Sequence, residues 1–170
     1  KLLDLVNQPI TLEESSPLFE SEQDYEDFMK RHRSHDVQHA SLKEYKGKAY
    51  LGIDSGSTTT KLVLLSEDHK ILYDSYSSNK GNPLDVVLKE LKTIYQINPD
   101  ICIGGSYATG YGEELMVHAF HLDGGIVETM AHYKAAEEFL PGVDFILDIG
   151  GQDMKCMRIK DHAIYSIMLN

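Results

Sequence analysis

Two short segments of the chain carry an aspartate, a glycine and a lysine at the same spacing. One is Asp54-Ser-Gly-Ser-Thr-Thr-Thr-Lys61 and the other is Asp148-Ile-Gly-Gly-Gln-Asp-Met-Lys155, so both fit Asp-x-Gly-Ser/Gly-x-x-x-Lys. Each segment follows one apolar run and leads into another, and an Asp-His pair comes after the second run, at Asp68-His69 and at Asp161-His162. The equal spacing predicts an internal duplication of a three-strand unit.

A tight turn that contains glycine is suited to binding phosphate. Its backbone N–H groups point into one concavity, and glycine permits positive φ and close approach of the ligand. Carboxylates at the strand ends, Asp54 and Asp148, can hold Mg²⁺, usually through water, and Lys61 can neutralise phosphate charge. Three hydroxyl donors follow the first glycine: Ser57, Thr58 and Thr59. We therefore expect the two turns to face each other and to bind a polyphosphate from both sides.

Asp-x-Gly also occurs in ordinary hairpin turns, where both residue types are favoured. The second, equally spaced copy favours the phosphate interpretation over a plain turn. The segments are not a Walker P-loop, because no Gly-x-x-x-x-Gly-Lys-Ser/Thr sequence occurs. Gly104-Gly105 and Gly110-x-Gly112 do not have the spacing of a dinucleotide-binding fingerprint.

Hydrophobic periodicity predicts the elements that position these turns. Runs of β-branched, aromatic and aliphatic residues predict strands at 50–54, 61–65, 71–76, 101–104, 125–127, 144–149, 155–159 and 163–169. Helices are expected at about 83–95, 109–120 and 128–139. The apolar face of the first helix is expected to contain Leu84, Val87, Leu88, Leu91 and Ile94. This order of elements predicts an α/β domain with a mixed sheet.

Composition narrows the class of protein. The chain has 170 residues, of which 42% are hydrophobic and 25% charged, which is typical of a globular protein. The formal net charge of -11 argues against a nucleic-acid-binding surface. No apolar run approaches the length of about 20 residues that spans a membrane. Cys102 and Cys156 are isolated, which favours a reducing, cytoplasmic compartment, and we expect both to be buried, inert thiols.

Residues 1–48 differ from the rest in their dense charge. A helix is expected within residues 17–33, with Phe19, Tyr25, Phe28 and Met29 as a narrow apolar stripe. Three histidines, His32, His35 and His39, suggest either a metal site or a solvated linker. We prefer the linker, because no cysteine or carboxylate cluster completes a tetrahedral set of ligands.

Four ordered motifs resemble the BadF/BadG/BcrA/BcrD ATPase family, whose members activate 2-hydroxyacyl-CoA dehydratases and benzoyl-CoA reductases. These motifs are Gly52-Ile-Asp-Ser-Gly-Ser-Thr-Thr-Thr-Lys61, Thr109-Gly-Tyr-Gly112, Glu128-Thr-Met-Ala-His132 and Leu147-Asp-Ile-Gly-Gly-Gln-Asp-Met-Lys155. The resemblance covers roughly residues 49–170 and implies the ribonuclease-H-like lobes of the actin/Hsp70/sugar-kinase superfamily. It further implies a connector at 1–48, a first lobe at 49–143 and the first strands of a second lobe at 144–170, within the second repeat of a tandem activase.

The resemblance also implies the roles of individual residues. Asp148 and Glu128 become candidate catalytic residues, with Glu128 orienting the attacking water, and Asp54 and Asp148 become Mg²⁺ ligands. The expected ATP- or ADP-binding residues are Asp54, Gly56, Ser57, Thr58, Thr59, Lys61, Thr109, Gly110, Gly112, Gly150, Gly151, Gln152 and Asp153. Two alternatives stay open: Glu128 as an ordinary acidic residue at a helix N-terminus, and the motif at 109–112 as a plain turn into a helix.

In this family, ATP hydrolysis drives low-potential electron transfer to an acyl-CoA dehydratase or reductase from a dimer that holds a 4Fe-4S cluster. The resemblance places the cluster cysteines after Asn170, so we expect a cluster and a homodimer only in the full-length protein, and weak or undetectable ATPase activity here. Alternative functions are a sugar or acetate kinase, for which we find no sugar-binding segment, a chaperone-like ATPase, or a regulatory repeat without catalysis.

Overall fold

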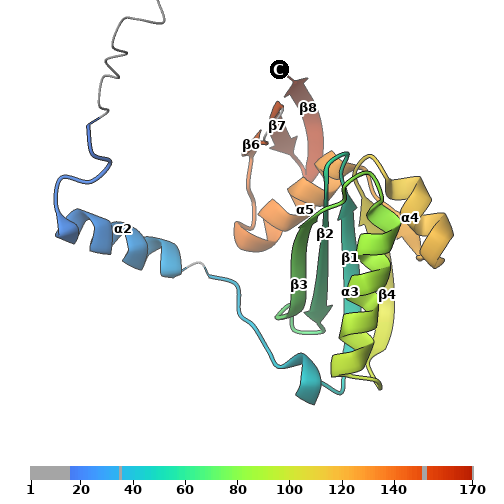
Figure 1. Cartoon of the computed structure of the whole chain (residues 1–170). Coiled ribbons are helices and arrows are strands. Elements are labelled where there is room, and N and C mark those ends of the chain that lie inside the picture. Colours follow the sequence, from blue (N-terminus) through green and yellow to red (C-terminus); the bar gives the residue numbers. More distant parts are fainter. Residues whose placement is uncertain (1–15, 35, 151–152, 170) are drawn as a thin grey trace, which may run out of the picture. The chain divides into compact units, whose positions relative to one another are not determined.

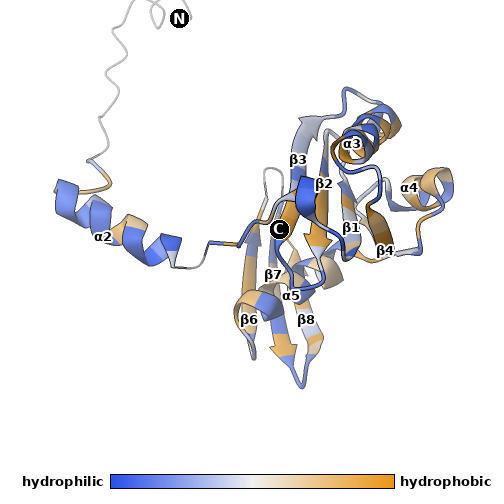
Figure 2. Cartoon of the chain, turned by 90° about the horizontal axis from the view of Figure 1, so that it is seen from below, coloured by the Kyte–Doolittle hydropathy of each residue, from blue (hydrophilic) through white to orange (hydrophobic). Residues whose placement is uncertain are grey.

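The computed structural model describes residues 16–34, 36–150 and 153–169, and the chain divides into two units at Asp36–Val37. In the first unit, helix α2 (Glu22–Arg33) is the helix expected within residues 17–33 (Figure 1). Its N-terminus is capped by Ser21, whose hydroxyl accepts the N–H of Asp24. None of its residues is buried, and Figure 2 shows that it is largely hydrophilic.

The second unit begins with a mixed sheet of five strands in the order β3-β2-β1-β4-β5. The strands are β1 (Lys48–Ser55), β2 (Thr59–Ser66), β3 (Ile71–Ser78), β4 (Cys102–Thr109) and β5 (Gly124–Gly125). β1 is antiparallel to β2 and parallel to β4. The mixed sheet predicted from the sequence is therefore confirmed, and its central strand carries Asp54 close to its carboxyl end.

Helices α3 (Pro83–Ile97) and α4 (Glu113–Phe120) pack on this sheet. The prolyl ring at the first position of α3 and the Asn82 cap start that helix, as its sequence predicts. Val87 and Ile94 are fully buried and share one core cluster with residues of β1 and β2. Figure 2 colours β2 as mainly hydrophobic. Leu88 is exposed, contrary to expectation. The buried line of α3 runs through Glu90 instead, whose carboxylate accepts the hydroxyl of Tyr73.

A second sheet has three antiparallel strands in the order β6-β7-β8. They are β6 (Phe145–Ile149), β7 (Met154–Lys160) and β8 (Ala163–Leu169). Helix α5 (Glu128–Phe139) precedes β6, and its Tyr133 is buried with Met157 and Ile159 of β7. This sheet has the same succession of strands as β1–β2–β3, as the internal duplication requires.

In the turns that carry the Asp-His pairs the histidines share one backbone conformation, whereas of the two aspartates only Asp161 has positive φ (51°). His69 (φ 61°) and His162 (φ 59°) both adopt the left-handed conformation. Each ring also contacts a carboxylate of α5: His69 Nδ1 lies 2.6 Å from Glu138 Oε1, and His162 Nδ1 lies 3.0 Å from Glu137 Oε1. Corresponding turns of the two repeats thus bind adjacent residues of one helix.

Three element boundaries differ from those predicted. β4 does not end at Gly104 but continues to Thr109, because Gly104 and Gly105 leave room for the side chains of Lys48 and Tyr50 on the neighbouring strand. The expected helix at 109–120 begins only at Glu113, after a turn. The expected strand at 125–127 is the two-residue β5, and Ile126 donates its N–H to the carbonyl of Ala108 (2.9 Å).

The prediction that Cys102 is buried was wrong, and Cys156 is only half-buried. Side chains alternate between the two faces of a strand, and Ile101 takes the buried position next to Cys102. Met157 likewise takes the buried position next to Cys156.

Within the second unit, the segment before β1 packs on the first sheet. Leu42, in a single 3-10 turn (Leu42–Glu44), is buried in the core, and Ala40 donates its N–H to the carbonyl of Ile71 (2.9 Å). Asn98, after α3, donates from Nδ2 to the carbonyls of Leu42 and Tyr45 (2.8 Å each). His39 forms a bridge with Ile71, whereas His35 lies outside the described residues. None of the helices among the described residues is long and apolar enough to cross a membrane.

The packing of α3 can be tested with two isoleucines of the same helix. Ile94 is 0% exposed and Ile97 is 39% exposed. Ile94→Ala should lower the free energy of unfolding by about 3 kcal/mol, because it removes buried methyl groups and leaves a cavity. Ile97→Ala should change it by less than about 1 kcal/mol. Urea unfolding followed by circular dichroism measures both, and equal losses would contradict the placement of this helix.

The contact at Glu137 predicts a pH dependence of stability. Hydrogen bonds from His162, Tyr133 and Lys134 lower the pKa of Glu137 to about 2. A lowered pKa stabilises the folded state above the unfolded-state pKa, and that stabilisation is lost as pH falls through about 2. Glu137→Gln should therefore be less stable than the wild type at pH 6, and the difference should shrink toward pH 2 in urea titrations. A difference independent of pH would argue against this contact.

Candidate functional site: two matched hairpins

The two repeated segments form hairpins with identical register. Asp54 lies directly opposite Lys61, and Asp148 lies directly opposite Lys155. In the first turn the N–H of Gly56 bonds the carbonyl of Thr59 at 2.9 Å, and in the second the N–H of Gly150 bonds the carbonyl of Asp153 at 2.9 Å. The common spacing of the sequence therefore reflects a common backbone structure.

In the first hairpin the opposed residues form an ion pair. Lys61 Nζ lies 2.7 Å from Asp54 Oδ2, and both side chains are partly exposed. The hydrogen bond that Lys61 donates to Asp54 raises the pKa of Lys61, while burial opposes that change. A lysine kept in its charged form at the surface can bind phosphate as a point cation.

In the second hairpin the opposed residues bind other partners. Asp148 Oδ2 lies 2.7 Å from His132 Nδ1 of α5. The side chain of Lys155 is only 12% exposed. Its Nζ lies 3.0 Å from Glu128 Oε1 and 3.1 Å from Asp153 Oδ2. Burial opposes the charged form of Lys155, but the hydrogen bonds that it donates to Glu128 and Asp153 outweigh burial, so the pKa of Lys155 is raised. The ion pair found in the first hairpin is thus replaced here by contacts with α5 and the turn.

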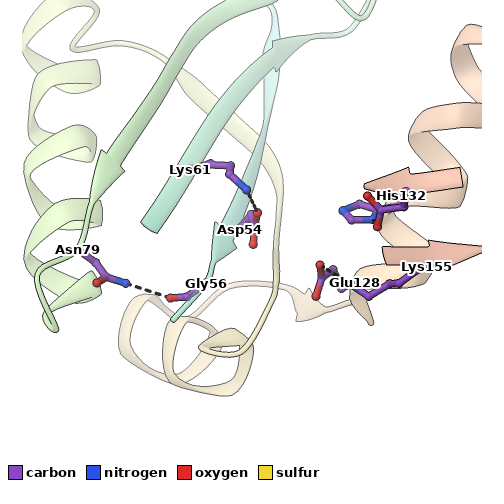
Figure 3. A network of polar contacts seen from close by, with 8 residues as sticks. Asp54, Gly56, Lys61, Asn79, Glu128, His132 and Lys155 are labelled. Atoms are coloured by element: carbon purple, nitrogen blue, oxygen red, sulfur yellow. Dashed lines mark hydrogen bonds and ion pairs between the residues drawn. The ribbon is translucent and has the colours of Figure 1, made fainter. Parts of the chain in front are cut away.

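Glu128 connects the electrostatics of the two hairpins. Its carboxylate is bound by Lys155 and also contributes to the raised pKa of Lys61. Figure 3 shows Glu128 between the Asp54–Lys61 pair on one side and Lys155 on the other. Its carboxylate therefore lies in the region between the two hairpins.

The motif at 109–112 packs directly against the first hairpin. Gly110 has φ +87°, and a Cβ added to it would lie 2.7 Å from Asp54 Oδ1 and 2.8 Å from the carbonyl oxygen of Ser55. Gly112 donates its N–H to that same carbonyl (2.8 Å), and a Cβ on Gly112 would collide with Ser55 Oγ. Both glycines are therefore required by close approach to the strand end that carries Asp54. Thr109, the register partner of Asp54 on β4, has a buried side-chain hydroxyl.

The predicted phosphate-binding residues lie where the spacing places them. The side chains of Ser57 and Thr58 are exposed at the first turn, and Thr59 begins β2. Gly150 and Asp153 flank the second turn, whereas Gly151 and Gln152 lie outside the described residues. A cavity of about 390 Å³ lies along the face of β1 and β2 in the first sheet. Asp54, Lys61 and Thr109 are among its lining residues.

The sequence analysis missed two contacts of this site. The first is the contact between His132 and Asp148. His132 lies four residues after Glu128 on the same face of α5, and this spacing is the signal that could have placed it at the site. Asn79 donates from Nδ2 to the carbonyl of Gly56 (3.0 Å) across 23 residues of sequence. No local pattern predicts that contact.

Comparison with known proteins supports the same interpretation. Residues 51–170 match the model of the BadF/BadG/BcrA/BcrD ATPase family. An uncharacterized protein of Methanocaldococcus jannaschii is 39% identical over 109 residues, which are 64% of this chain and 42% of that protein. The (R)-2-hydroxyglutaryl-CoA dehydratase activating ATPase of Acidaminococcus fermentans is 27% identical over 123 residues, 71% of this chain and 46% of that protein.

A solved structure also resembles the chain. It is the activator of the 2-hydroxyisocaproyl-CoA dehydratase from Clostridium difficile with bound ADPNP, with a TM-score of 0.57 and 26% identity over 72% of this chain and 45% of that one. The expected ribonuclease-H-like fold of an actin/Hsp70-type ATPase lobe is therefore confirmed. The chain spans somewhat less than half the length of the curated relatives that it matches.

The close packing at Gly110 can be tested against a second glycine. Gly142 also has positive φ (+80°), but an added Cβ would meet nothing within 4 Å. Gly142→Ala should cost about 1 kcal/mol of unfolding free energy, from the left-handed backbone alone. Gly110→Ala should cost about 2 kcal/mol more, because its methyl group must displace Asp54 or Ser55. Urea unfolding compares the two variants, and equal costs would exclude the tight contact.

Proposed function

Because the chain belongs to the BadF/BadG/BcrA/BcrD ATPase family, we propose that its paired hairpins bind the phosphates of ATP or ADP with Mg²⁺. In the whole protein, this nucleotide site would drive electron transfer to an acyl-CoA dehydratase or reductase. The observation that carries the proposal is the identical register of Asp54–Lys61 and Asp148–Lys155. Relatives that are named as a dehydratase-activating ATPase and as an activator with bound ADPNP support it.

The carboxylates at the strand ends fit Mg²⁺ that is bound mainly through water. Asp54 and Asp148 are both partly exposed, and no group of three or more His, Cys, Asp or Glu residues forms a cage among the described residues. Mg²⁺ typically keeps several waters and binds one or two carboxylates, so two separate aspartates are sufficient. When bound, the metal would neutralise phosphate charge; Lys61 and the backbone N–H groups of the turns would hold the phosphate oxygens.

The second hairpin would supply the groups around the attacking water. Lys155 fixes the carboxylate of Glu128, and His132 fixes that of Asp148. A carboxylate that is held from one side keeps its other lone pairs available, and Glu128 can use them to orient a water molecule toward the terminal phosphate. The turn at 109–112, which packs against Asp54 and Ser55, would hold Asp54 in place.

The remaining parts of the proposal concern the whole protein. We propose residues 49–143 as the first lobe, 144–170 as the start of the second lobe, and residues 1–48 as a connector between tandem repeats. The acyl-CoA dehydratase or reductase component would be the partner of a homodimer in a reducing cytoplasm. Cys102 and Cys156 do not fit a 4Fe-4S cluster, because each stands alone in a different sheet, on β4 and on β7.

Calorimetric titration of the chain with Mg·ADP and Mg·ATP tests the nucleotide site. Asp54→Ala should weaken binding at least about tenfold, because it removes both a metal ligand and the partner that positions Lys61. Asp100→Ala, at an exposed aspartate in the turn before β4, is the control for the loss of one negative charge. Wild-type protein without measurable affinity, or an Asp54→Ala variant with unchanged affinity, would refute the assignment.

A further inference from the structure

The loop that joins β3 to α3 holds the first hairpin turn through one buried side chain. Asn79 is 4% exposed, and its Nδ2 donates to the carbonyl of Gly56 at 3.0 Å (Figure 3). Its backbone N–H donates to the carbonyl of Thr58 at 2.9 Å. Asn79 thus binds two of the carbonyls at the tip of the proposed phosphate-binding turn. The function proposed above assigns no role to this residue.

The orientation of the Asn79 amide follows from its partners. Its Oδ1 accepts the N–H of Gly81 at 3.1 Å, and its backbone carbonyl accepts the N–H of Asn82 at 2.7 Å. Gly81 can only donate at that atom and the Gly56 carbonyl can only accept, so the reverse placement of oxygen and nitrogen would break both bonds. The loop that contains Gly81 (φ +83°) therefore aims Nδ2 at the hairpin.

These bonds determine where the N–H groups of the turn point. In a planar trans peptide the C=O and the following N–H point in opposite directions. Because the carbonyls of Gly56 and Thr58 point toward Asn79, the N–H groups of Ser57 and Thr59 point away from it. Two N–H groups directed away from the same anchor can converge on an anion.

We propose that Asn79 is a positioning residue for phosphate binding: it fixes two peptide planes so that the N–H groups of Ser57 and Thr59 are presented to the phosphate oxygens. This proposal rests on the nucleotide-binding function proposed above. Without Asn79, the Gly56–Ser57 peptide plane is free to rotate, and binding must then restrict that rotation at a cost in affinity.

A second asparagine provides a matched control. Asn98 is 6% exposed, its Nδ2 also donates to backbone carbonyls, and its Oδ1 also accepts a backbone N–H, that of Asp100 at 3.2 Å. Its bonds tie Leu42 and Tyr45 to the end of α3, not the hairpin turn. Asn79→Ala and Asn98→Ala therefore remove the same kind of buried interaction from two places.

Calorimetric titrations of the 170-residue chain with Mg·ADP and with magnesium pyrophosphate test the proposal. Asn79→Ala should weaken both about tenfold, the effect of losing about one net hydrogen bond, whereas Asn98→Ala should stay within about twofold of the wild type. Urea unfolding of both variants shows whether their stability losses are comparable. Equal affinity of Asn79→Ala and wild type would overturn the role of Asn79, whereas wild-type protein that binds neither ligand would overturn the proposed function itself.

Two further measurements cover the case in which Asn79→Ala does not fold. Asn79→Asp keeps the size and the acceptor for Gly81 but replaces the donor to Gly56, and it should lose affinity at least as strongly. In the isotope-labelled wild type, magnesium pyrophosphate should shift the amide resonances of Ser57 and Thr59 more than that of Gly81. If pyrophosphate binds and leaves Ser57 and Thr59 unchanged, the proposal is wrong.

Discussion

The antiparallel register of the two hairpins is the constraint on which the rest of the site depends. Because side chains alternate along a strand, a slip of one residue would move Asp54 or Lys61 to the other face of the sheet. The fixed separation of seven residues, together with a turn closed by the N–H of Gly56 or Gly150, prevents that slip. A turn with the same length and the same closing bond thus places an acid and a base opposite each other twice in one chain.

Hairpins of the same register nevertheless hold different side-chain contacts, and helix α5 is the reason. In the first hairpin Asp54 and Lys61 bind each other, whereas in the second His132 binds Asp148 and Glu128 binds Lys155. Lys61 of the first repeat is partly exposed, whereas Lys155 of the second repeat holds the carboxylate of Glu128. We propose that the first hairpin binds phosphate and that the second hairpin supplies the groups around the attacking water. These different roles follow from the difference in side-chain contacts.

The sequence predicts the order of elements along the chain, the helices and both hairpins, because these depend on periodicity and on short spacings. It misplaces what depends on contacts between distant segments. β4 passes through Gly104 and Gly105 because of side chains on β1, and Leu88 is exposed because Glu90 takes the buried line of α3. The role of Asn79 depends on a loop 23 residues away from Gly56. His132 is an intermediate case, since helical spacing relates it to Glu128 but does not identify Asp148 as its partner.

The ion pair between Asp54 and Lys61 has a thermodynamic consequence for binding. Each residue serves as the counterion of the other at a separation of 2.7 Å. The Lys61 ammonium has three donors, so a phosphate that binds it would share the positive charge with Asp54 and leave that carboxylate more available to a cation. A cation that takes Asp54 likewise frees Lys61 for an anion. Each ligand removes an obstacle to the other, and linkage requires that the benefit be equal in both directions. In the nucleotide site that we propose, metal and polyphosphate would therefore bind the first hairpin cooperatively.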